Sequence, residues 1–171
     1  GKIPKYRGDG GAYWEDGAGS TSYETAMNRE SQRMLPVAEM AESLATLFQP
    51  HLAYPMAEFR DAWKNLLFYD EHTWGSSRSV SQPDRDLATG QWDYKRAYAW
   101  RAHWAAKDLM MRSLNRLVQN VSREGQTLLV MNPDLWPRTD IVELQLDPKK
   151  EIVDLASSKP IPKQVVAEKD G

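Results

Sequence analysis

The chain has 171 residues, of which 41% are hydrophobic and 27% are charged, which is a globular composition and excludes a disordered or fibrous protein. Its formal net charge is −2 and its Lys and Arg residues are dispersed, so the chain lacks the basic footprint of a nucleic-acid-binding protein. No apolar run approaches the ~20 residues that a membrane-spanning helix needs, and the absence of Cys excludes disulfides and thiolate chemistry.

Residues 1–22 are rich in glycine and contain an aromatic pair. This composition predicts an ordered loop, and Ser20, Thr21 or Ser22 could cap a helix that follows it. The segment has neither the basic start nor the apolar stretch of a signal peptide. The sequence therefore shows no targeting segment and leaves the cellular compartment open.

Residues 23–124 are predicted to form a bundle of three amphipathic helices. The first runs from Tyr23 to Phe48, and the second runs from Pro55, which suits a first helical turn, to Tyr69. Residues 75–90 have the composition of a loop, and the third helix continues from there to about Val121. The apolar residues expected to face the core are Met34, Ala38, Met40, Ala41, Leu44, Ala45 and Phe48 in the first helix, Met56, Phe59, Trp63, Leu66 and Leu67 in the second, and Trp104, Met111, Leu114, Val118 and Val121 in the third.

The pattern changes to strand periodicity in residues 125–171. Thr127–Met131 is a short apolar run typical of a buried strand, and Val142–Leu146 alternates apolar with polar residues. Glu151–Leu155 and Gln164–Ala167 are predicted as two more strands. The fold class is therefore mainly α with a β appendage, in which a three-helix bundle precedes an incomplete, truncated antiparallel β-sandwich.

Three stretches in this order resemble one family. They are YWEDGAGSTSYETAMNRESQRML at 13–35, AWKNLLFYDEHTWGSS at 62–77 and TLLVMNPDLWPRTDIVELQL at 127–146. Together they are similar to the middle region of glycoside hydrolase family 38, the α-mannosidases. The resemblance implies a helical middle domain between a catalytic α/β domain and large β-sandwich domains.

The resemblance also implies a chemistry, namely retaining hydrolysis of α-mannosidic bonds by a nucleophilic carboxylate, an acid/base carboxyl and a zinc ion that holds sugar hydroxyls. In the family the two carboxyl groups and most zinc ligands belong to the α/β domain, so we expect no catalytic residue in this chain. We also expect the isolated chain to be inactive and to carry no zinc. The implied partners are a carbohydrate substrate, the N-terminal catalytic domain and the remaining C-terminal β-domains.

Trp14 matches the tryptophan of the family's tyrosine–tryptophan loop, which faces the sugar pocket. An indole face stacks well on the apolar side of a pyranose, so the resemblance implies that Trp14 contacts substrate. Asn28 and Arg29 stand at the family's Asn-Arg position, where we expect Arg29 to brace loops through carboxylates.

His72 lies at the end of the second predicted helix, among Asp70, Glu71 and Thr73. The family takes a final zinc ligand from the loop after this helix, and zinc favours imidazole nitrogen and carboxylate oxygen. Relatives commonly place this His five residues before a loop glycine, which here is the position of Asp70, whereas His72 stands three residues before Gly75. Either a shortened loop brings His72 to the metal or Asp70 supplies an oxygen ligand, and we predict His72.

The leading hypothesis is thus a chain that contributes the middle bundle to the active site of an α-mannosidase-like hydrolase. The alternative is a non-catalytic carbohydrate-binding or interaction module that kept the bundle. Under the leading hypothesis we also expect exposed apolar surface beside the loop after the second helix and along the strands.

Overall fold

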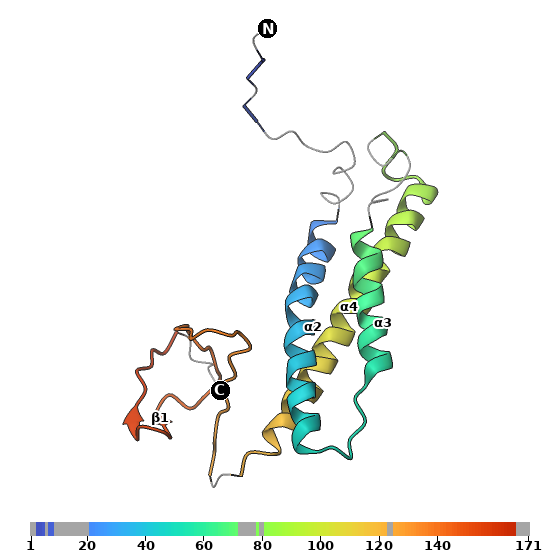
Figure 1. Cartoon of the computed structure of the whole chain (residues 1–171). Coiled ribbons are helices and arrows are strands. Elements are labelled where there is room, and N and C mark those ends of the chain that lie inside the picture. The colour runs from blue at the N-terminus through green and yellow to red at the C-terminus, as the bar shows by residue number, and fades with distance from the viewer. Residues whose placement is uncertain are drawn as a thin grey trace. The chain divides into compact units, whose positions relative to one another are not determined.

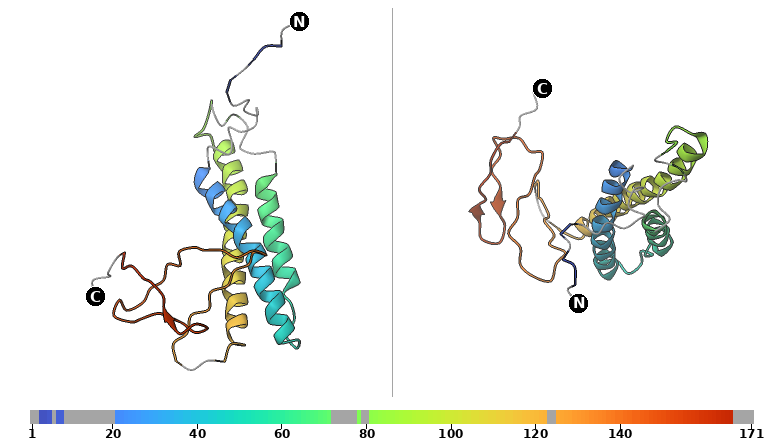
Figure 2. Two further views of the ribbon diagram at one scale, coloured as in Figure 1. Left: turned by 60° about the vertical axis from the view of Figure 1, so that its left-hand side comes forward. Right: turned by 90° about the horizontal axis from the view of Figure 1, so that it is seen from above.

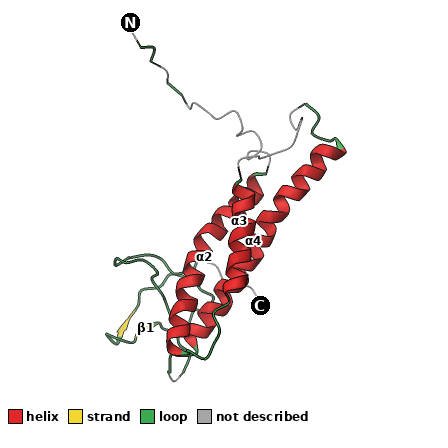
Figure 3. Cartoon of the chain, turned by 45° about the vertical axis from the view of Figure 1, so that its right-hand side comes forward, coloured by secondary structure: helices red, strands yellow, loops and turns green. Residues whose placement is uncertain are grey.

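The computed structural model describes residues 3–5, 7–8, 21–71, 78, 81–122 and 125–166. Its helices within these ranges are α2 (Ser22–Phe48), α3 (Met56–Asp70) and α4 (Asp86–Val118). They lie side by side and run alternately down, up and down (Figures 1 and 3). A small antiparallel sheet follows them, so the predicted helical bundle with a β appendage is confirmed. None of the described helices is long and apolar enough to cross a membrane.

The helix ends follow the local sequence signals. Thr21 is the N-cap of α2, and its carbonyl accepts the first helical hydrogen bond from the Thr25 amide at 2.9 Å, although its side chain makes no cap bond. α2 then continues through Pro36 as one helix. Pro55 is the N-cap residue of α3, and its carbonyl accepts hydrogen bonds from the Glu58 and Phe59 amides, both at 3.1 Å.

α4 is the central helix of the bundle, because its backbone runs close to both α2 and α3, whereas the backbones of those two helices come close at few points (Figure 2). Its buried face is built from small residues, among them Ala99, Ala102 and Ala106. Small side chains let helix axes approach closely, and the larger side chains of the neighbouring helices then fill the space between them. The main core consists of Met34, Leu35, Ala38, Phe59, Ala62, Leu66, Ala102, Ala106 and Leu109.

The predicted core stripe of the third helix is wrong except at Leu114, which is half-buried and packs against a smaller core cluster of Ala41, Ala45 and Leu117. Trp104 is 60% exposed and Met111 is 66% exposed, and Val118 and Val121 are exposed as well. The helix carries two stripes of helical period, one of large residues and one of alanines, and the bundle buries the alanines. Trp104 instead packs its ring against the Lys107 ammonium, 5.6 Å from the ring centroid.

The other two helices keep most of their predicted core faces. Phe59 and Leu66 of α3 are buried, while Met56 and Leu67, which were predicted beside them, are exposed. In α2 the predicted core positions that turn out exposed are Met40 and Phe48.

Residues 134–171 form a second compact unit, of which the structure describes 134–166. Two short strands, β1 (Val153–Asp154) and β2 (Lys159–Pro160), pair antiparallel within it. Asp154 organises the turn between them, since its carboxylate accepts the Ala156 amide at 3.0 Å and the Ser157 hydroxyl at 2.5 Å. These hydrogen bonds, led by that of Ser157, lower the pKa of the Asp154 carboxyl.

Two of the predicted strands are wrong, because Thr127–Met131 and Val142–Leu146 form no strand. All of Thr127–Val130 is exposed, so the run is not buried either. Of Gln164–Ala167, the described part to residue 166 is not a strand. Alternation of apolar and polar residues favours a β-strand, but a strand forms only where a neighbouring strand pairs with its backbone N–H and C=O groups. The described residues hold one two-stranded sheet, and a sandwich remains a prediction.

Candidate functional site at the end of α3

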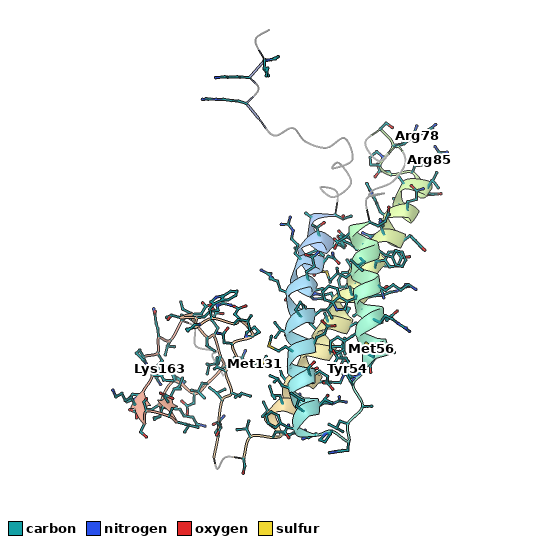
Figure 4. All side chains as sticks on the ribbon, viewed as in Figure 1. Tyr54, Met56, Arg78, Arg85, Met131 and Lys163 are labelled. Atoms are coloured by element: carbon teal, nitrogen blue, oxygen red, sulfur yellow. The ribbon has the colours of Figure 1, made fainter. Side chains whose placement is uncertain are left out.

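The start of α2, the end of α3 and the start of α4 lie at one end of the bundle (Figure 1). Arg78 and Arg85, just before α4, mark this end, while Tyr54 and Met56 at the start of α3 mark the opposite one (Figure 4). The topology therefore places Thr21 and Glu71, the described residues that border the two segments singled out by the sequence, at the same end of the bundle. One leads into α2 and the other leaves α3.

Tyr69 joins these two segments directly. Its phenol oxygen lies 2.8 Å from the Thr25 hydroxyl and 3.2 Å from the Thr21 hydroxyl, and it also donates to the Thr21 carbonyl at 3.4 Å. Burial raises the pKa of the Tyr69 phenol, because the anion would lose its hydration. The residue keeps its proton and fastens the last turn of α3 to the first turn of α2.

Asp70 is the last residue of α3, and both of its carboxylate oxygens bind α2. Asn28 donates from Nδ2 to Oδ1 at 2.8 Å, and Gln32 donates from Nε2 to Oδ2 at 2.8 Å. Asn28 and Gln32 are four residues apart and so lie on one face of α2. Asn28 is buried, and its Oδ1 has no hydrogen-bond partner among the described residues.

Lys95 of α4 holds the same end of α3 from the other side. Its ammonium donates to the Phe68 carbonyl at 2.9 Å, to the Glu71 carboxylate at 3.0 Å and to the Glu71 carbonyl at 3.4 Å. Lys95 is only 8% exposed. A cation at this place satisfies carbonyls that a helix C-terminus leaves without intrahelical donors, and it complements the negative end of the helix dipole.

Three consecutive residues at the end of α3 are thus each held by a neighbouring helix. α2 binds Tyr69 and Asp70, and α4 binds Glu71. Buried or partly buried polar contacts of this kind specify one arrangement of the helices. The end of α3 is therefore tied to both neighbouring helices.

The sequence-predicted site residues divide into two groups. Trp14 and His72 lie outside the described residues, so their roles stay predictions. Asp70 is described and holds α2, as reported above. Arg29 is exposed, and its neighbour Asn28 binds a carboxylate, that of Asp70 at the end of α3. The chain's other two histidines were not predicted as site residues. His51 is exposed and lies between α2 and α3, whereas His103 is buried, 3.7 Å from a carboxylate oxygen of Glu30.

The described residues do not fit a zinc centre of their own. Nowhere in the described ranges do three His, Cys, Asp or Glu side chains come together as a metal site would require. At the end of α3 the two carboxylates, of Asp70 and Glu71, are already bound by amides and by an ammonium. Any zinc near this end needs ligands from outside the described part of the chain.

The sequence patterns did not predict Lys95 as a site residue, and they predicted no contact for Asn28. A signal for Lys95 was present, since it stands seven residues after Ala88 and four before Ala99, both of which are buried. A single lysine in a small-residue stripe of heptad spacing indicates a buried cation with a defined partner. Asn28 carried no such signal, because its partner lies 42 residues away.

Two shallow surface grooves, of about 440 and 550 Å³, border α3, and both are lined by Lys64 and Phe68. Phe68 contacts the Tyr98 ring of α4, with the ring centroids 5.4 Å apart. Phe68 and its neighbour Leu67 are exposed, which confirms the expected apolar surface beside the end of this helix.

The profile of one protein family, described as the alpha mannosidase middle domain, matches residues 12–117. No curated protein and no solved structure matches the chain. The match spans all three helices to within one residue of the end of α4, and it includes the polar network at the end of α3. This chain belongs to the α-mannosidase middle-domain family of glycoside hydrolase family 38.

Proposed function

We propose that this chain is the middle region of a zinc-dependent retaining α-mannosidase and supplies two loops to its active site. The observation that carries the proposal is the family match over residues 12–117. The contact between Tyr69 and Thr21 supports it, because Trp14 precedes Thr21 in the sequence by seven residues and His72 follows Tyr69 by three.

The bond-breaking chemistry is assigned to groups outside the described residues. Retaining hydrolysis needs two free carboxyl groups about 5–5.5 Å apart, one as nucleophile and one as acid and base. Among the described residues, Asp70 and Glu71 are the carboxylates at the end of α3, and both bind neighbouring helices. The proposal therefore assigns the catalytic pair to the α/β domain that the resemblance implies.

The bundle acts in this proposal as a rigid support. Trp14 would offer an apolar face to the sugar ring, and His72 would complete the ligand set of a zinc ion whose other ligands lie in the catalytic domain. The contacts of Tyr69, Asp70 and Glu71 hold the starting point of the second loop. Accurate placement of such groups contributes to catalysis because small displacements at an active site cost large factors in rate.

Activity measurements on two forms of the protein test this proposal. The full-length protein that carries this chain should hydrolyse an aryl α-mannoside, and the 171-residue chain alone should not, with or without added zinc. Turnover by the chain alone would contradict the assignment of catalysis to another domain. A full-length protein that binds mannosides without hydrolysing them would instead support the carbohydrate-binding alternative.

A further inference from the structure

The smaller of the two surface grooves, of about 440 Å³, is lined by residues of both α3 and α4. Its side chains take no part in the contacts that hold the end of α3. The lining residues are Asp61, Lys64, Asn65 and Phe68 of α3 and Tyr98 and Arg101 of α4. The four residues of α3 follow one another at steps of three, one and three, so they lie on one face of that helix. Two helix faces thus line one open groove.

Two aromatic rings form the apolar part of this groove. The ring centroids of Phe68 and Tyr98 lie 5.4 Å apart at an interplanar angle of 34°, and Phe68 keeps 44% of its surface exposed. The Tyr98 hydroxyl donates to the Tyr94 hydroxyl at 3.0 Å, which raises the pKa of the Tyr98 phenol and keeps it neutral. Neutral rings with open surface can stack on the apolar C–H side of a sugar ring.

The charged groups of the groove are unpaired among the described residues. The Lys64 ammonium lies 5.8 Å from the centroid of the Phe68 ring, and neither Lys64 nor Arg101 makes a hydrogen bond or ion pair with a described residue. The Asp61 carboxylate accepts the Asn65 amide at 3.3 Å and has no cation partner there. The groove therefore offers two cations and one carboxylate. Ammonium and guanidinium donors bind the oxygens of acidic groups through charge-assisted hydrogen bonds.

We propose that this groove binds an anionic sugar, a pyranose ring that carries a carboxylate or a sulfate group. The rings of Phe68 and Tyr98 would stack on the sugar, Lys64 and Arg101 would bind its acidic group, and Asp61 would accept from its hydroxyls. Small-molecule sites commonly combine an apolar surface with a few convergent polar groups in this way. The groove is a site beyond the proposed function, because binding there needs neither zinc nor a catalytic domain.

NMR titration of the 171-residue chain tests this proposal with two sugars that differ in charge, methyl glucuronide and methyl glucoside. Backbone amide signals of residues 61–68 and 94–101 should shift with methyl glucuronide. The affinity for the glucuronide should exceed that for the glucoside by about 5-fold or more, because only the acidic sugar engages both cations. Added salt should reduce this difference, since the cations are exposed to solvent. Equal affinity for the two sugars would overturn the proposal.

Substitutions then locate the binding. Lys64→Gln and Arg101→Gln should each weaken glucuronide binding by about 3-fold or more, the size of a solvent-exposed ion pair. Phe68→Leu should weaken the binding of both sugars, because it removes the stacking surface. Circular dichroism should show unchanged helix content in all three variants, since none of these side chains is buried in the core.

The matched control is Lys107→Gln on α4. The Lys107 ammonium also lies over an aromatic ring, 5.6 Å from the centroid of Trp104, but neither residue lines the groove. Glucuronide affinity should not change in this variant. An equal loss in Lys107→Gln and Lys64→Gln would mean that the sugar does not bind in the groove.

Two further ligands identify the acidic group and the role of the rings. A sulfated methyl glucoside that binds more tightly than the glucuronide would support the proposal and name sulfated sugars as the source. Inorganic sulfate that binds the same residues as tightly as either sugar would overturn it, because the rings would then contribute nothing. Activity of the full-length protein does not enter these tests, so the groove and the proposed function can fail separately.

Discussion

Residues 21–122 and residues 134–166 satisfy their backbone groups in different ways. In the helical region each hydrogen-bonded turn closes between residues four apart, so every helix forms from its own segment. In the second region pairing needs a partner strand, and it is confined to the neighbourhood of residues 152–161, where the Ile161 amide donates to the Ile152 carbonyl at 2.8 Å. Large apolar side chains there stay exposed, including Leu135, Ile141 and Val166.

This difference shows which apolar residues carry the stability of each region. In the bundle, three helices bury one common core, and its largest side chains are almost wholly covered. In the second region the exposed apolar side chains gain nothing from burial within the described residues. Replacing a large apolar side chain by alanine should therefore lower the free energy of unfolding much more in the bundle than in the second region.

The largest effect is expected at Phe59, which is 1% exposed in the core. Phe59→Ala should lower the free energy of unfolding of the bundle by about 3–5 kcal/mol, because it removes apolar contacts and leaves a cavity. Leu135→Ala, at a side chain that is 98% exposed, should change it by less than about 0.5 kcal/mol. Urea unfolding followed by circular dichroism at helical wavelengths measures both, and equal losses would mean that the two regions share one core.

A smaller effect is expected at Arg116, which pairs with the carboxylate of Glu42 between α4 and α2. Glu42 is only 1% exposed, so Arg116→Met leaves a buried carboxylate without its cation. The expected loss of stability is about 2 kcal/mol, below the range for fully buried pairs because the Arg116 side chain is partly exposed.

Arg112→Met serves here as the surface counterpart, since its partner Glu58 is exposed to solvent, unlike Glu42, and Arg112 itself is partly exposed. Its loss should stay below about 1 kcal/mol. Thermal unfolding of Arg116→Met and Arg112→Met under the same conditions measures how much stability each variant loses. If Arg116→Met were no more destabilising than Arg112→Met, burial of Glu42 would not govern the strength of its pair.

The smallest effect on stability is expected at the turn between β1 and β2. The pKa of Asp154 lies below the ordinary value of 3.8 because Ser157 and the Ala156 amide bind its ionised form. A lowered folded-state pKa means that ionised Asp154 stabilises the turn above its ordinary pKa, and that this contribution is lost as pH falls through the lower value.

NMR titration of the Asp154 side chain and the Ser157 amide should show one transition, with an apparent pKa below 3.8. Asp154→Asn should remove the pH dependence of the Ser157 signal while leaving the helical signals unchanged. A transition at the ordinary value would show that the turn does not form in solution.

The helices were predictable because their signals are local. The observed bounds of α2 and α3 differ by one residue from the predicted ones, since the caps and Pro55 act on adjacent backbone groups. The buried face of α4 was not predictable from the size of its side chains, because a helix with both an alanine stripe and an aromatic stripe can bury either. Its neighbours decided the matter, and they favour the face that allows close approach.

At the candidate site, too, local features were predictable from the sequence and contacts between helices were not. The sequence by itself determined the family resemblance, the three-helix plan and the concentration of polar residues at the end of the second helix. Only the tertiary structure decided that Asp70 binds Asn28 and Gln32 and that Lys95 binds Glu71, because these partners lie 24 to 42 residues apart along the chain. A hydrogen bond between distant segments depends on how helices are placed in space, and no local pattern of residue types encodes that placement.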